Sequence, residues 1–384
     1  MLDSLIDIFR LKQYFNLMLG IRDVGYGIRD DAEFIDTIRR AVLPLPFEEP
    51  TPHDRHPFSR GNPRPTGTVE QDFALVATGG SGALASVTGA WKAFEDWNIL
   101  PSAVSVCSGS SLFGFPLAAG VPADEVAHFT LSMRAEDYVD INWHAFRKLP
   151  LSAGRGFAGI VLGERLEKAY TRLLGNMTLK ELKIPCYAPL WNIEENRIEY
   201  IGPDTYPDLP VARAIRAAIS IPLFINPVRI GHGHWCDGGI VDIFPVRPIL
   251  DLGRSLPRVL AINGFYPPDF AGEDATGWEA KHASIFHIAS QVRSSQQIEL
   301  ARTNLRLLQE HSQVDLISPV PYSVVQGIGF YKQFIDKSDW PKFMRQGRKA
   351  THTVLARWAL GAAARPRRRD TSRSTTRRPT TRPV

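Results

Sequence analysis

The chain has 384 residues, of which 44% are hydrophobic and 22% charged, a composition typical of a globular protein with a large core. Its formal net charge is +5, and residues 365–384, with eight arginines and one aspartate, contribute +7. The rest of the chain therefore has a net charge near −2, and we do not expect a folded basic face that would bind nucleic acid. Three cysteines are too few for a disulfide framework and favour a reducing compartment.

The N-terminal part predicts helices followed by a linker. Residues 2–19 place apolar side chains at mainly helical spacing with charges between them, as in a helix that packs on a domain or lies on a membrane surface. A second helix is expected near 31–42, and the Pro-rich segment after it is typical of a linker. Since no uninterrupted apolar stretch is long enough to span a bilayer, we expect a cytoplasmic protein whose contact with membranes is peripheral.

From residue 73 onward the sequence alternates between buried strands and helices. FALVAT (73–78) and AVSVCS (103–108) are apolar strands, and each is followed by a turn of Gly and Ser and then by a helical segment. This order predicts an α/β fold with a mainly parallel central sheet flanked by helices. Further strands are expected at 186–192, 197–201 and 258–264, and further helices at 162–174, 210–218, 290–310 and 341–360.

The turn after the second strand holds a candidate nucleophile. Gly109-Ser110-Ser111 matches the first half of a G-x-S-x-G elbow, in which a serine is held at a sharp strand-to-helix turn. The second glycine is missing, because Phe113 stands at its place and Gly114 comes one residue later. Taken alone, the pattern fits a Ser-rich turn as well as a nucleophile at Ser111.

A glycine-rich loop follows the first strand. Gly79-Gly80-Ser81-Gly82 leaves backbone N–H groups unobstructed by side chains, so the loop is suited to an oxyanion or a phosphate. Residues 80–85 also fit the dinucleotide pattern G-x-G-x-x-A, but the next strand ends in Cys107-Ser108 without the acidic residue that would hold a ribose.

Asp237-Gly238-Gly239 is the third candidate element. A carboxylate exposed by a glycine turn can approach a serine hydroxyl and take its proton, although such a tripeptide is most often only a turn. Nothing assigns a role to the nearby histidines, and Asp242 is expected to be a hydrogen-bonding residue of a turn or sheet edge. The spacing of Cys and His predicts no metal site, and no cofactor is expected.

In this order the three elements resemble the patatin-like phospholipase family. The resemblance covers roughly residues 72–250 and includes GGSGALASVTGAWKAFED, SGSS with AAGVPADEV downstream, ARAIRAAISIPLFINPV and CDGGIVDIFPV. It implies a three-layer α/β fold and a Ser–Asp dyad of Ser111 and Asp237. It also implies an oxyanion hole built from the backbone N–H groups of Gly79, Gly80, Ser81 and Gly82. The glycines that would support the elbow and the turn are Gly109, Gly238 and Gly239.

Two departures from the family pattern accompany the resemblance. Ala83 stands where a basic residue is usual, with Leu84 in place of a glycine, and Phe113 replaces the second glycine of the elbow. The resemblance implies a lipid acyl hydrolase of the phospholipase, lysophospholipase or esterase type. The two departures leave a weakly active or inactive lipid-binding protein as an alternative, and an acyltransferase is a further alternative.

The domain organisation expected from these patterns has four parts. Residues 1–66 form an N-terminal helical extension and linker, 67–270 the patatin-like catalytic domain, 271–362 a C-terminal helical part packed on it, and 363–384 a disordered Arg/Thr/Pro tail. The expected partner is a lipid substrate. Peripheral contact with an anionic membrane surface would run through the N-terminal helix or the tail.

Overall fold

The computed structural model describes residues 57–58, 72–142, 158–252, 256–271, 285–325, 333 and 336–364. The two predicted N-terminal helices, nearly all of the linker and the Arg-rich tail (365–384) lie outside these residues. Within the described part of the chain, no helix is both long and apolar enough to cross a bilayer.

The centre of the fold is a sheet that has eight strands within the described residues. Five of them are parallel neighbours and run in the order β10-β9-β1-β2-β4. Their bounds are β1 Phe73–Ala77, β2 Ala103–Ser105, β4 Cys186–Asn192, β9 Arg258–Ile262 and β10 Gln313–Ile317. The prediction of a mainly parallel α/β sheet is confirmed, and the expected strands at 186–192 and 197–201 match β4 and β5 residue for residue.

The sheet continues beyond β4 with antiparallel strands. The second half of β4 pairs with β5 (Arg197–Ile201) and with β8 (Gly233–Asp237), which in turn pairs with β7 (Val228–Ile230). Only Gly231 and His232 connect β7 to β8, and a connection of two residues can join only antiparallel neighbours. A separate two-stranded sheet joins β3 (Gly159–Val161) to β6 (Leu223–Ile225).

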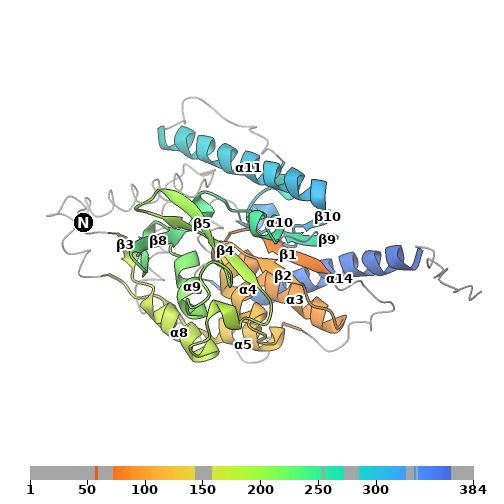
Figure 1. The fold of residues 1–384 in the computed structure, drawn as a ribbon, viewed down its shortest axis with the longest axis horizontal. Coiled ribbons are helices and arrows are strands. Elements are labelled where there is room, and N and C mark those ends of the chain that lie inside the picture. Colours follow the sequence, from red (N-terminus) through yellow and green to blue (C-terminus); the bar gives the residue numbers. More distant parts are fainter. Residues whose placement is uncertain are drawn as a thin grey trace, which may run out of the picture.

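Helices cover both faces of the sheet (Figure 1). Side chains of β1 alternate between two hydrophobic clusters, with Phe73 and Leu75 in one and Ala74 and Val76 in the other. The first cluster is packed by α3 (Ser86–Asp96), α4 (Ser111–Ala118), α5 (Ala123–Ser132), α8 (Glu164–Leu174), α9 (Val211–Ala218) and α14 (Trp340–Ala364). The second is packed by α10 (Arg247–Leu250) and α11 (Ile285–His311). The three layers follow from a sheet that is apolar on both faces.

Short helices complete the described chain. They are α6 (Ala135–Tyr138), α12 (Tyr322–Val325), and the 3-10 helices η2 (Gly82–Ala85), η3 (Ser108–Ser110), η4 (Leu179–Glu181), η5 (Gly238–Ile240) and η6 (Pro268–Phe270). The helices expected at 162–174, 210–218, 290–310 and 341–360 correspond to α8, α9, α11 and α14.

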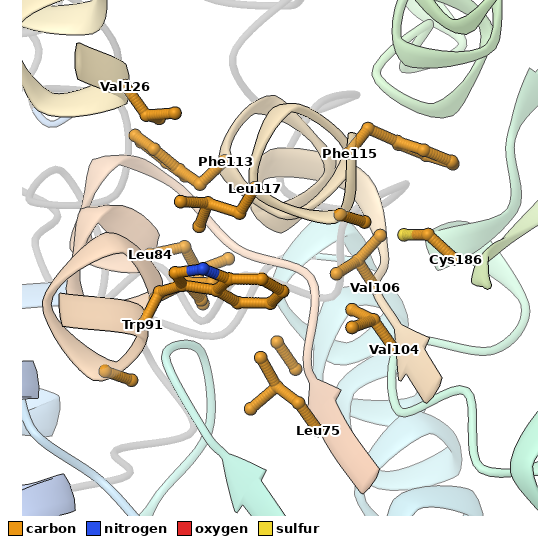
Figure 2. Packing of buried hydrophobic residues seen from close by; sticks show 14 of the residues in the cluster. Leu75, Leu84, Trp91, Val104, Val106, Phe113, Phe115, Leu117, Val126 and Cys186 are labelled. Atoms are coloured by element: carbon orange, nitrogen blue, oxygen red, sulfur yellow. The ribbon is translucent and has the colours of Figure 1, made fainter. Parts of the chain in front are cut away.

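Helix α4 lies in the middle of the larger cluster and is apolar on nearly every side. Figure 2 shows Phe113, Phe115 and Leu117 leaving it in different directions, with Leu117 above the indole of Trp91. Such a helix is typical of the interior rather than the surface of a domain. It follows directly on β2 and η3, so its first turn is fixed by the core on one side and by the end of the sheet on the other.

Candidate functional site

Asp237 lies at the end of β8 and begins the turn that the sequence predicted. Its Oδ1 accepts a hydrogen bond of 2.8 Å from the N–H of Gly239, so the carboxylate caps the 3-10 helix η5. The side chain is buried, with 2% exposure, and the side chain of Ser108 lies within hydrogen-bonding reach of it and favours its charged form. Burial raises the pKa of Asp237 to about 7, although Ser108 and the N–H of Gly239 act in the opposite direction by favouring the charged form.

Both glycines after Asp237 are required by close contacts. A Cβ on Gly238 would lie 2.6 Å from the carbonyl oxygen of Pro189 in β4. A Cβ on Gly239 would lie 2.9 Å from Cys107 Sγ and 3.0 Å from Asp237 Oδ1. The Asp-Gly-Gly sequence therefore lets this turn approach the elbow after β2, because any larger residue would hold the two apart.

Ser108 is the residue that the elbow presents to Asp237. It follows β2 by three residues and adopts φ of +50°, a left-handed conformation that is uncommon for a residue other than glycine. The turn is closed by Ser110, whose Oγ donates to the carbonyl of Cys107 and accepts from its N–H, both at 2.8 Å. A serine in a strained strand-to-helix turn, with its side chain near a buried carboxylate, has the geometry of a nucleophile elbow.

Ser111, the serine expected from the sequence, occupies a different position. It is the first residue of α4, has regular helical dihedral angles and is fully buried. Its Oγ has no hydrogen-bond partner among the described residues. The structure thus brings Ser108 to Asp237, and not Ser111. The available signal was the end of the strand, because Ser108 lies at the turn itself whereas Ser111 already belongs to the following helix.

The glycine-rich loop packs directly against this elbow. A Cβ on Gly109 would collide with the carbonyl oxygen of Gly80, and Gly80 itself has φ of +150° and lies against the carbonyl of Gly264. Gly109 is therefore required by the close approach of the two backbones, and Gly80 is required both by a close approach and by its positive φ. The contact places the loop after β1 beside the elbow that carries Ser108.

The backbone of the loop differs from the expectation at one residue. The N–H of Gly79 donates to the carbonyl of Ile243 at 2.8 Å, so it is already engaged and is not available to an oxyanion. The N–H groups of Gly80, Ser81 and Gly82, and that of Gly109 after the elbow serine, have no acceptor within the described part of the chain. These are the groups that could stabilise a developing negative charge.

A small cavity joins the elbow, the loop and the turn. It encloses about 20 Å³, room for one water molecule. Among its lining residues are apolar side chains that keep Ser108 and Asp237 in a poorly solvated environment: Ile221, Ile240, Ile243 and Phe265. The remaining lining residues are Gly80, Ser108, Asp237, Gly239 and Gln297.

Gln297 is a site residue that the sequence did not reveal. It comes from α11, about 60 residues after Asp237 in the chain, and only 3% of it is exposed. Its Nε2 donates to the carbonyl of Gly239 at 3.3 Å, and its Oε1 accepts from the hydroxyl of Tyr266 at 3.0 Å. No local pattern marks this glutamine, because its role depends on how α11 packs against the sheet.

The other candidate residues have structural surroundings. Asp242 is buried rather than at a surface, and its carboxylate accepts from the hydroxyl of Tyr200 at 2.6 Å and from Asn304 Nδ2 at 3.1 Å. Burial raises the pKa of Asp242 to about 6. Cys107 and Cys236 are buried, as expected, and burial raises the pKa of the Cys236 thiol to about 12.

The departures from the family pattern are accommodated by the core. Phe113 is 1% exposed, and its ring packs edge-to-face with that of Trp340, with 5.6 Å between the ring centroids. Trp340 also packs against Gly82, where a Cβ would collide with its Nε1. Phe113 therefore does not distort the start of α4; it fills the space between the elbow helix and α14. His234, by contrast, is half exposed and pairs with Glu194 at 2.6 Å, away from the dyad.

These contacts define what the site can do. A serine hydroxyl within reach of a carboxylate of raised pKa can be deprotonated as it attacks a carbonyl carbon. The N–H groups of the neighbouring loop and of Gly109 that have no acceptor within the described residues could receive the oxyanion that forms. Within the described residues, no group of three or more His, Cys, Asp or Glu is placed to hold a metal ion.

Comparison with known proteins bears on the same segment. The family model described as patatin-like phospholipase matches residues 75–250, which include both Ser108 and Asp237. An uncharacterized NTE family protein of Mycobacterium bovis is 26% identical over 141 residues, covering 37% of this chain and 35% of that protein. The lysophospholipase NTE1 of Cryptococcus neoformans is 24% identical over 237 residues, covering 61% of this chain and 14% of that protein.

The comparison with solved structures gives a partial similarity. Human GIVD cytosolic phospholipase A2 superposes with a TM-score of 0.43 at 10% identity, over 88% of this chain and 68% of that one. The matched segment spans about a third of the length of the mycobacterial relative and a smaller share of the fungal one.

Proposed function

We propose that this chain, which contains a patatin-like phospholipase domain at residues 75–250, hydrolyses carboxylic esters of lipids with Ser108 as nucleophile and Asp237 as base. The observation that carries the proposal is the position of Ser108, which lies at the strained turn after β2 and lines the same small cavity as the buried carboxylate of Asp237. The raised pKa of Asp237, about 7, supports it, because a base works best when its pKa is near the working pH.

In the first step Ser108 Oγ attacks the acyl carbon while Asp237 takes its proton. The carbonyl oxygen becomes an oxyanion, and the N–H groups of Gly80, Ser81, Gly82 and Gly109 are its donors. Collapse of the tetrahedral intermediate breaks the bond to the alcohol oxygen, which leaves with the proton from Asp237. The acyl group remains on Ser108 as an ester.

In the second step a water molecule takes the place of the alcohol. Asp237 accepts a proton from this water as its oxygen attacks the acyl carbon, and the same loop donors hold the second oxyanion. The bond to Ser108 breaks, and Ser108 Oγ recovers its proton from Asp237. The products are a carboxylic acid and the free enzyme.

Ser108 replaces Ser111 in this proposal for two reasons. The side chain of Ser108 lies within hydrogen-bonding reach of the base and lines the cavity, whereas the hydroxyl of Ser111 has no partner among the described residues. The N–H that follows an elbow serine is normally one of the oxyanion donors, and for Ser108 this is Gly109, which touches the glycine-rich loop.

The substrate class that we propose is a lysophospholipid or another lipid with one acyl chain. Apolar residues around the dyad suit an acyl group, and a fungal relative carries the name lysophospholipase. Peripheral contact with an anionic membrane surface would give the enzyme access to such substrates.

The test is labelling by a fluorophosphonate probe, followed by peptide mapping and by hydrolysis of a lysophosphatidylcholine. We expect the label on Ser108, and Ser108→Ala should abolish labelling and lower kcat by about a thousandfold or more. Ser111→Ala is the matched control, a second buried serine in the same turn region, and it should keep both labelling and most of the activity.

The reverse pattern, with label and activity lost only in Ser111→Ala, would return the nucleophile to Ser111. A folded protein that neither labels nor hydrolyses the lipid would contradict the enzymatic proposal and favour a lipid-binding role.

A further inference from the structure

We propose that Gln297 is a specificity-determining residue that donates a hydrogen bond to an oxygen of the alcohol part of the substrate. The inference rests on the proposed function, since it concerns the cavity of Ser108 and Asp237. Gln297 lies outside the segment matched by the family model, so the inference depends on its own contacts.

The orientation of the Gln297 amide is fixed from two sides. Its Oε1 accepts from Tyr266 Oη at 3.0 Å, and burial raises the pKa of that tyrosine well above its usual value, so the phenol remains a donor. Its Nε2 donates to the carbonyl of Gly239 at 3.3 Å. A flipped amide would place its oxygen against the carbonyl oxygen of Gly239, two acceptors face to face, so this orientation is favoured.

One N–H of this amide has no partner among the described residues. An amide nitrogen has two hydrogens, and Gly239 receives only one of the two. Gln297 is 3% exposed and lines the same cavity as Ser108 and Asp237, so an acceptor inside the cavity would satisfy its second hydrogen.

The position of Gln297 indicates which part of the substrate it contacts. Gln297 reaches the cavity from the side of Asp237. Its Nε2 donates to the carbonyl of Gly239, and the N–H of the same Gly239 donates to the Asp237 carboxylate. The group that lies nearest to Asp237 in the reaction is the leaving alcohol, which must collect its proton there. A glycerol hydroxyl or ester oxygen can accept from Gln297, whereas a leaving group without a further oxygen near the ester gains nothing from it.

The experiment compares two esters with the same acyl chain. One is a lysophosphatidylcholine, whose glycerol carries oxygen next to the ester, and the other is the simple ethyl ester of the same fatty acid. Gln297→Met keeps the length of the side chain and removes the amide. We expect it to lower kcat/KM for the lysophospholipid by about tenfold or more and to leave the ethyl ester within about twofold.

Tyr266→Phe provides a second variant that acts through the same amide. It removes the hydroxyl that fixes the orientation of Gln297, so the lysophospholipid should again be affected more than the ethyl ester. Asn304→Ala is the matched control on the same helix, seven residues further on. It bonds to Asp242 and to the carbonyl of Phe244 without lining the cavity, so it should affect both esters equally.

The labelling rate of Ser108 separates this inference from the proposed function. Unchanged fluorophosphonate labelling of Gln297→Met, with a loss confined to the lysophospholipid, supports the specificity role. Equal losses on both esters would overturn it and leave Gln297 as a support for the Asp237 turn. Failure of the proposed function is different, since the wild-type protein would then neither label at Ser108 nor hydrolyse either ester.

Discussion

Asp237 illustrates a competition between two effects at one residue. Removal from water disfavours the charged carboxylate, while the side chain of Ser108 and the N–H of Gly239 favour it. The first effect is larger, so the pKa of Asp237 rises to about 7 instead of falling below the usual value for an aspartate. The carboxylate is therefore partly protonated at neutral pH, and a small change in its surroundings alters the fraction that can act as a base.

We predict that kcat/KM rises with pH through about 7 and then levels off. The base must be ionised to accept the proton of Ser108, and the free enzyme's Asp237 sets that ionisation. Initial rates on a soluble short-chain ester between about pH 5 and 9 measure this pH dependence of kcat/KM. Asp237→Asn should keep the bond from Gly239 and lose both the activity and this pH step. A wild-type profile that is flat over the same interval would exclude Asp237 as the base.

At the scale of elements, α14 is joined to α3 along one side of the fold. Gly89 of α3 and Gly347 of α14 let the two backbones touch, since a Cβ at either position would collide with a carbonyl of the other helix. Near the end of α3, Asp96 accepts from Arg348 at 2.7 Å and from His352 at 2.9 Å. The first residue of α14, Trp340, packs against Gly82 of the oxyanion loop.

We predict that Gly347→Ala destabilises the protein although it raises helix propensity. Ala is favoured over Gly inside a helix by about 1 kcal/mol, but the methyl group would meet the carbonyl of Ser86 and force the helices apart. A net loss of about 2 kcal/mol or more in the free energy of unfolding is expected, measured by urea denaturation. Thr353→Ala, at an exposed position of the same helix, is the control and should be near neutral or slightly stabilising. A stabilised Gly347→Ala protein would contradict the close crossing.

The elements that could be predicted from the sequence are those whose apolar runs are continuous. β1, β4 and β9 are buried on both faces and were recognisable for that reason, and the Asp-Gly-Gly turn was marked by its own composition. β7 and β8 were missed, because VRIGHGHW is polar and forms a hairpin only through pairing with β4. The G-x-S-x-G pattern favours Ser111, whereas the turn position of Ser108 depends on where β2 ends.

The contributions of α11 and α14 to the site could not be predicted in the same way. Gln297 and Trp340 are ordinary helix residues in the sequence, and both reach the site only through tertiary packing. A periodic pattern predicts that a helix exists and which of its faces is buried. It does not predict which part of the sheet that face will meet.

For the whole molecule, charge is distributed unevenly between the body and one end. The Arg-rich tail contributes +7 to a net charge of +5, so the body is near −2. A bilayer with anionic headgroups attracts such a segment, and the attraction is worth about 1 kcal/mol per basic residue held near the surface. The body alone gains little from this effect.

We predict that removal of residues 365–384 weakens binding to vesicles that contain phosphatidylserine. Sedimentation of the full chain and of the shortened chain with such vesicles, at low and high salt, measures the effect. The full chain should bind more tightly at low salt by at least about tenfold, and the difference should shrink as salt screens the charges. Vesicles of phosphatidylcholine alone are the control. Equal binding of both chains to the anionic vesicles would show that the tail has no part in the contact.

The position of Gln297 and Trp340 late in the chain has a consequence for the newly made protein. Synthesis proceeds from the N-terminus, so the segments that carry Ser108 and Asp237 leave the ribosome before α11 and α14 do. Until these helices dock, the glycine-rich loop lacks the indole behind it and the cavity lacks the wall that α11 supplies. We therefore expect an unfinished chain to carry both residues of the proposed dyad and yet to remain inert toward lipids.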